Sequence, residues 1–96
     1  MSTTTWRSRL RPFLPILRAR YGVRQLWLFG PHTRRDAPPG APLDILADID
    51  GALSYDDFHA LQTALAEIAG MPVELVLKGS MDPAIAEIVI PEMIAL

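Results

Sequence analysis

The sequence predicts a single α/β (α+β) domain in which helices flank a small β-sheet. Three short apolar runs are typical of buried strands, and the segments around them carry apolar residues at helical spacing. The chain has 96 residues, of which 50% are hydrophobic, so it suffices for one core and leaves no room for a second. We therefore expect residues 1–96 to fold as one unit.

The first predicted element is an amphipathic helix over residues 6–21. Proline falls at positions 12 and 15, and it is tolerated in the first turn of a helix but is costly further along. We therefore expect the helix proper to begin near Pro12. Its apolar stripe consists of Leu10, Phe13, Leu14, Leu17 and Tyr21.

The three apolar runs predict strands over residues 23–29, 43–49 and 73–77. The first run is bounded by glycine on both sides and the third follows a proline, both of which are common strand limits. Between the first two runs lies the loop sequence APPGAP, which is too short to serve as a linker. The order of elements is helix, strand, loop, strand, helix, strand, helix.

Capping residues predict the other two helices. Ser54 with Asp57 resembles a capping box, and the amphipathic helix that follows should end at Gly70. Asp82 and Pro83 form an N-cap and first-turn pair for a last helix through Val89.

Charge is distributed unevenly along the chain. Eight of the nine basic residues lie at or before Arg35, whereas all eleven acidic residues lie at or beyond Asp36. Two interpretations stay open: the basic helix neutralises the acidic remainder of the chain, or it offers a basic face to a nucleotide phosphate, a nucleic acid or an acidic partner.

The composition also indicates the cellular setting. The chain has no cysteine, which excludes disulfides and thiolate metal sites and fits a reducing cytosol. Arginines and prolines interrupt the N-terminal region, which argues against a signal peptide or a membrane span. We expect a cytoplasmic protein that does not associate with membranes.

One motif resembles a known family. Leu28, Phe29 and Gly30 end the first predicted strand, and Asp44 opens the second in fixed register with them. The later segment PVELVLKG carries Glu74, and the C-terminal IAEIVIPEMIAL completes the likeness. These segments resemble the minimal nucleotidyltransferases of the polymerase-beta superfamily, small proteins often encoded beside HEPN-domain toxins. In that family the strand end reads Leu-Phe-Gly-Ser and is followed, ten residues on, by Asp-x-Asp.

The resemblance implies a fold and a site. The fold would be a mixed sheet of three to four strands flanked by helices. The turn at Gly30, Pro31 and Arg34 would hold nucleotide phosphates, and Asp44 and Glu74 would supply the catalytic, metal-binding carboxylates. Such a site would transfer a nucleotide from ATP with Mg²⁺ held by carboxylate oxygens, so ATP and Mg²⁺ are expected if any activity remains and no cofactor is expected otherwise.

Two prolines depart from the family pattern. Pro42 stands at the first aspartate position, so the paired carboxylate is missing and a two-metal site is not expected. Pro31 stands at the serine position and removes both the hydroxyl and a backbone N–H. The following amides of His32, Thr33 and Arg34 could still face an anion.

Two residues keep alternative interpretations. Arg34 either touches a phosphate or is a solvated loop arginine. Glu74 is either a vestigial metal ligand or the solvent-facing position of an edge strand.

Three functions follow from these observations. The favoured one is a catalytically degenerate protein that acts as the antitoxin-like partner of a HEPN-type toxin. The alternatives are an active nucleotidyltransferase that adenylylates protein with Asp44, Glu74 and one metal ion, and a regulatory module that binds nucleotide or nucleic acid. Self-association into a homo-oligomer is left open. The favoured function also rests on C-terminal apolar residues expected to be exposed: Ile90, Met93, Ile94 and Leu96.

Overall fold

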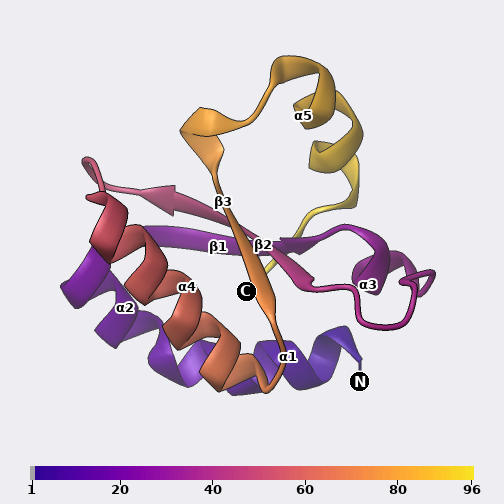
Figure 1. Ribbon diagram of the computed structural model, residues 1–96, viewed down its shortest axis with the longest axis horizontal. Helices are drawn as coiled ribbons and strands as arrows, with labels where there is room; N and C mark the ends of the chain where they lie inside the picture. The colour runs from indigo at the N-terminus through magenta and orange to yellow at the C-terminus, as the bar shows by residue number, and fades with distance from the viewer. Residues whose placement is uncertain (1) are drawn as a thin grey trace.

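A four-stranded mixed sheet with helices on both faces forms the protein (Figure 1). The computed structural model describes residues 2–96. Three short 3₁₀ turns, Arg11–Phe13, Lys78–Ser80 and Ile90–Glu92, join or extend the longer elements. In chain order those elements are α1 (Thr3–Leu10), α2 (Leu14–Tyr21), β1 (Val23–Phe29), α3 (Pro31–Arg34), β2 (Leu43–Ile49), α4 (Tyr55–Ala69), β3 (Val73–Leu77), α5 (Pro83–Val89) and β4 (Ile94–Ala95).

The strand order is β3-β2-β1-β4. β1 pairs antiparallel with both β2 and β4, whereas β2 and β3 pair in parallel. A parallel pair needs a crossover connection, and α4 supplies it between β2 and β3. The predicted α/β class and mixed sheet are confirmed.

Two hydrophobic clusters lie on opposite faces of the sheet. On one face α1, α2 and α4 cover the larger cluster, which includes Trp6, Leu28 and Leu61 (Figure 1). On the other face α5 covers a smaller cluster built around Phe29, Leu46 and Val89. Because side chains alternate along a strand, β2 sends Leu46 into the smaller cluster and its two neighbours into the larger one.

The N-terminal helix differs from its prediction. It begins at Thr3, capped by the Ser2 hydroxyl, and not near Pro12. The prolines are accommodated by a break: Pro12 lies in the 3₁₀ turn and Pro15 in the first turn of α2, where a missing N–H costs little. Phe13, expected in the apolar stripe, is 42% exposed because this turn changes the helical phase.

The capping predictions are confirmed. The Ser54 hydroxyl accepts the Asp57 N–H at 3.1 Å, and α4 ends at Gly70 with a positive φ of 76°. The Asp82 carboxylate accepts the Ala84 N–H at 2.8 Å at the start of α5.

The C-terminal segment was wrongly expected to expose its apolar residues. Ile94 pairs with Leu28 of β1, Leu96 is buried, and Met93 packs against the smaller cluster. Among these C-terminal residues Ile90 alone is strongly exposed, at 57%. Pairing with β1 reverses the expectation, since the segment becomes an edge strand that closes the sheet.

No helix among residues 2–96 is long and apolar enough to cross a membrane.

Candidate active site

The turn after β1 brings the chain against the start of β2. Gly30 has a φ of +81°, which a side chain would strain, and a Cβ there would collide with the Asp44 carboxylate. Phe29 and Asp44 are register partners of the antiparallel pair, which sets this close approach. Glycine is therefore required at position 30 for both its conformation and its size.

Two backbone amides that were expected to face an anion, those of Thr33 and Arg34, form hydrogen bonds within the turn. The N–H groups of Thr33 and Arg34 donate to the Gly30 carbonyl at 3.1 and 3.4 Å, and the Thr33 hydroxyl donates to the same oxygen at 2.6 Å. The expectation that these two amides face an anion is wrong, because the short helix α3 engages them. His32 holds the loop by an Nε2 contact of 2.7 Å with the Ala41 carbonyl.

Asp44 and Glu74 lie side by side although 30 positions separate them in the sequence. They are register partners on the parallel strands β2 and β3. Burial raises the pKa of Asp44 to about 6, and the nearby Glu74 carboxylate adds to the effect. Glu74 is exposed on the edge strand and adjoins Asp44. The structure is therefore compatible both with a vestigial metal ligand and with a solvent-facing position of an edge strand.

The two prolines occupy backbone positions that suit them. Pro31 opens α3, where its fixed φ is favourable and a donor is dispensable. Pro42 directly precedes β2 and stands two residues before Asp44. Neither contributes a carboxylate or hydroxyl, so the carboxylates that β2 and β3 place beside this turn are those of Asp44 and Glu74.

Arg34 is paired with carboxylates of this chain, and its side chain is 45% exposed. Its Nη1 donates to both carboxylate oxygens of Glu92 at 2.8 Å, and its Nε donates to Asp36 at 3.4 Å. His32 and Arg34 also lower the pKa of Asp44, against the larger effects of burial and Glu74. Glu92 was missed by sequence reasoning, since nothing near it in the chain indicates a partner 58 residues away.

The donor set allows a test of the metal that the family resemblance implies. Mg²⁺ is usually held by one or two carboxylates together with substrate phosphates. Asp44 and Glu74 supply two carboxylates, and within residues 2–96 no group of three or more His, Cys, Asp and Glu side chains is placed to hold a metal ion. The residues fit a single Mg²⁺ shared with phosphates and do not fit a two-metal pair.

The arginines of α1 and α2 do not neutralise the acidic part of the chain through ion pairs. Between residues 2 and 96 the ion pairs are Arg24 with Asp50, and Arg34 with Asp36 and Glu92. Arg9 instead donates to the Ala69 carbonyl at the end of α4, at 2.7 Å. This favourable contact with a helix C-terminus ties α1 to α4.

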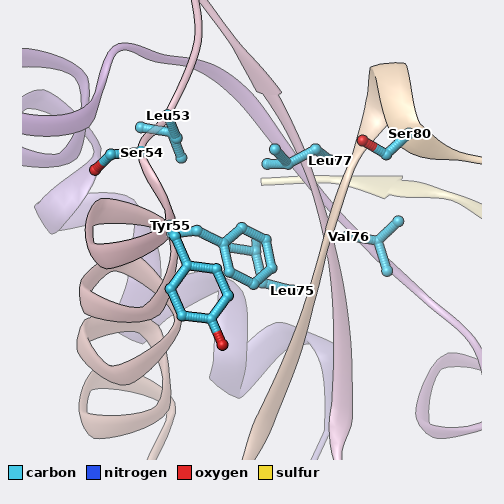
Figure 2. Close-up of a pocket in the computed structure, with 8 residues that line it drawn as sticks. Leu53, Ser54, Tyr55, Leu75, Val76, Leu77 and Ser80 are labelled. Carbon is cyan, nitrogen blue, oxygen red and sulfur yellow. The ribbon is translucent and has the colours of Figure 1, made fainter.

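A cleft of about 500 Å³ between the start of α4 and β3 lies apart from these residues. Figure 2 shows Leu53, Tyr55 and Leu75 among the side chains around it. The lining is mostly apolar and includes no acidic, basic or histidine side chain. It carries none of the chemistry expected of nucleotide transfer.

Comparison with known proteins relates the whole arrangement to one family. The chain is 36% identical over 78 residues to protein adenylyltransferase MntA of Thermococcus cleftensis, an alignment that covers 81% of this chain and 79% of that protein. The chain belongs to the minimal nucleotidyltransferase family. No family model matches it.

Solved structures agree with this membership. A structure assigned as a minimal nucleotidyltransferase superimposes with a TM-score of 0.80 at 29% identity and covers 100% of this chain and 97% of its own. A tri-AMPylated Shewanella oneidensis HEPN toxin in complex with MNT antitoxin matches with a TM-score of 0.68 at 18% identity, covering 94% of this chain and 70% of that one. This second likeness shows the minimal nucleotidyltransferase fold alone.

Proposed function

We propose that this minimal nucleotidyltransferase has lost catalysis and acts by binding, as the antitoxin-like partner of a HEPN-type toxin. The observation that carries the proposal is the pair of prolines. The fold is intact, but Pro31 and Pro42 stand where the family has a phosphate-binding serine and a metal-binding aspartate. The solved complex of a related antitoxin with a HEPN toxin supports the kind of partner. Binding requires the fold and its surface but not the missing groups.

Co-expression with a HEPN-domain protein from the same genome tests the partnership. A stable complex on size-exclusion chromatography is expected, and it should persist in an Asp44→Ala variant because the carboxylate is not needed for binding. A monodisperse protein that never co-elutes with the HEPN protein would contradict the proposal. The same column reports self-association of the chain alone.

Repair of the two prolines tests the loss of catalysis. Calorimetry with ATP and Mg²⁺ compares the native chain with a Pro31→Ser, Pro42→Asp variant. We expect the repaired protein to bind ATP with Mg²⁺ much more tightly than the native chain does, because it regains a hydroxyl and a second carboxylate. Equally strong binding by both proteins would show that the native site is not degenerate.

Residual protein adenylylation is the second candidate, and the register pairing that places Asp44 beside Glu74 favours it. These carboxylates would hold one Mg²⁺, which when bound would neutralise phosphate charge and so favour transfer of AMP. The naming of the Thermococcus relative as a protein adenylyltransferase points the same way. Incubation of the HEPN protein with labelled ATP and Mg²⁺ decides it, since transfer no greater than that of Asp44→Ala would exclude the activity.

Nucleic-acid or nucleotide binding is the third candidate, and the arginines of α1 and α2 favour it. Within the described chain, Arg7, Arg11 and Arg18 form no ion pair, so their charges are not consumed by this protein's own carboxylates. Binding through them should weaken steeply as salt is raised, because phosphate contacts release counterions. Affinity that is absent or independent of salt would exclude this function.

A further inference from the structure

Glu92 places a carboxylate on the turn where the family resemblance implies that nucleotide phosphates are held. Its Oε1 accepts the Gly30 N–H at 3.3 Å, and both of its oxygens accept Arg34 Nη1 at 2.8 Å. The Glu92 carboxylate thus accepts hydrogen bonds from both a backbone N–H and a guanidinium. A phosphate would seek the same donors, because arginine binds carboxylate and phosphate oxygens alike.

The contact is more protected than an ordinary surface ion pair. The Glu92 side chain is 20% exposed, whereas both partners of the Arg24–Asp50 pair are more than half exposed. Exposed pairs contribute little because water and salt screen them, and partial burial reduces that screening. Arg34 itself is 45% exposed, and we therefore expect water and salt to screen its contact with Glu92 less than they screen the Arg24–Asp50 pair.

The segment around Glu92 is held on both sides of the carboxylate. Before it, Val89 is buried in the cluster beneath α5, and after it Ile94 pairs with Leu28 of β1. In the turn between these anchors Ile90 is 57% exposed, and the side chain of Glu92 reaches back to Gly30 and Arg34. Glu92 could leave Arg34 by a local change in this turn while both anchors stay in place.

We propose that Glu92 is an internal anion that occupies the phosphate position of the Gly30 turn, so that a phosphate-bearing ligand must displace it. This inference rests on the proposed descent of the turn from a nucleotide site and does not require a HEPN partner. Arg34 is also close enough for its charge to act on Asp44, which places Glu92 at the edge of the candidate active site. Binding of phosphate and release of the turn Ile90–Glu92 are then reciprocally coupled.

Glu92→Gln is the variant that tests displacement, because it removes the charge and keeps the side-chain shape. Its matched control is Glu87→Gln, which removes an equal charge from an exposed position of α5. Calorimetry of the purified chain uses inorganic pyrophosphate as the probe, with ATP as a second ligand and adenosine as a ligand without phosphate. We expect Glu92→Gln to bind pyrophosphate about tenfold more tightly than the native chain. This factor corresponds to a native protein in which Glu92 leaves the phosphate position free about a tenth of the time.

The controls define the outcomes. Glu87→Gln and adenosine should show no gain, and adding Arg34→Met to Glu92→Gln should abolish it, because the gain depends on the freed guanidinium. Equal pyrophosphate affinity of Glu92→Gln and Glu87→Gln, including no binding by either, would overturn the proposal. A gain of the same size for adenosine would also overturn it, since it would show that phosphate is not the competing group.

A measurement on the native chain keeps the test independent of the variant's folding. Pyrophosphate added to ¹⁵N-labelled protein should shift the amide signals of both Gly30 and Glu92, because the Glu92 carboxylate leaves the Gly30 N–H. A saturable shift at Gly30 with none at Glu92, or no shift at either amide, would contradict displacement. Failure to bind a HEPN protein would leave both measurements unaffected, so the two proposals can fail separately.

Discussion

Neutralising Asp44 should stabilise the folded protein at neutral pH. The pKa of this carboxyl is raised from 3.8 to about 6, first by burial and then by Glu74. The folded protein therefore holds the proton more tightly than the unfolded chain does. The contribution of Asp44 to stability is fully present below the unfolded pKa, is lost as the pH rises from about 4 to 6, and is level above that window.

The size of the effect follows from the two pKa values. Without any screening by solvent, their difference would lower the free energy of unfolding by about 3 kcal/mol at pH 7.5. The carboxyl is only part-buried, so solvent screening reduces the expected cost to about 1–2 kcal/mol. Asp44→Asn should stabilise the protein by that amount at pH 7.5 and by little near pH 4.

Urea unfolding followed by fluorescence of the two tryptophans measures this difference at each pH. Asp48→Asn is the matched control, because it removes an equal charge from the same face of β2 away from Glu74. The gain for Asp44→Asn should exceed that of the control and should grow between pH 4 and pH 7. A gain that is the same at both pH values, or a loss of stability at pH 7.5, would refute the reasoning.

Three substitutions and one surface control test the packing and capping that position the site, each by urea unfolding. Gly30→Ala should cost about 2–4 kcal/mol, because the new Cβ meets the Asp44 carboxylate and φ is positive; a loss below about 0.5 kcal/mol would contradict the close approach. Leu28→Ala should cost about 3 kcal/mol by opening a cavity in the larger cluster, whereas Ile88→Ala, at a 67% exposed position, should change stability by less than about 0.5 kcal/mol. Ser54→Ala should cost about 1 kcal/mol through loss of the α4 cap, with no effect if the cap is not formed in solution.

Local patterns in the sequence were sufficient for most of the elements. Apolar runs predict β1, β2 and β3, and the capping residues Ser54 and Asp82 predict the starts of α4 and α5. These signals act between residues a few positions apart, so they can be read along the chain. The prolines of the first helix were misjudged because a 3₁₀ turn that holds Pro12 separates two short helices, and Pro15 lies in the first turn of the second.

The C-terminal strand could not be predicted in the same way. Ile94 and Ala95 form too short a run for any periodicity, and only the free edge of β1 makes them a strand. The same pairing buries Leu96 and removes most of the apolar surface that the sequence analysis had assigned to a partner. An interaction surface inferred from apolar composition alone therefore fails where a strand edge lies within reach.

The candidate site shows the same division. The sequence by itself determined the presence of Asp44 and Glu74, the fixed spacing from Gly30, and the two prolines that remove a hydroxyl and a carboxylate. Only the tertiary structure decided that strand register sets the two carboxylates side by side and that Glu92 occupies the donors of the Gly30 turn. Residue identity determines which groups exist, but charge interactions depend on distance and burial, which folding creates from positions far apart in the chain.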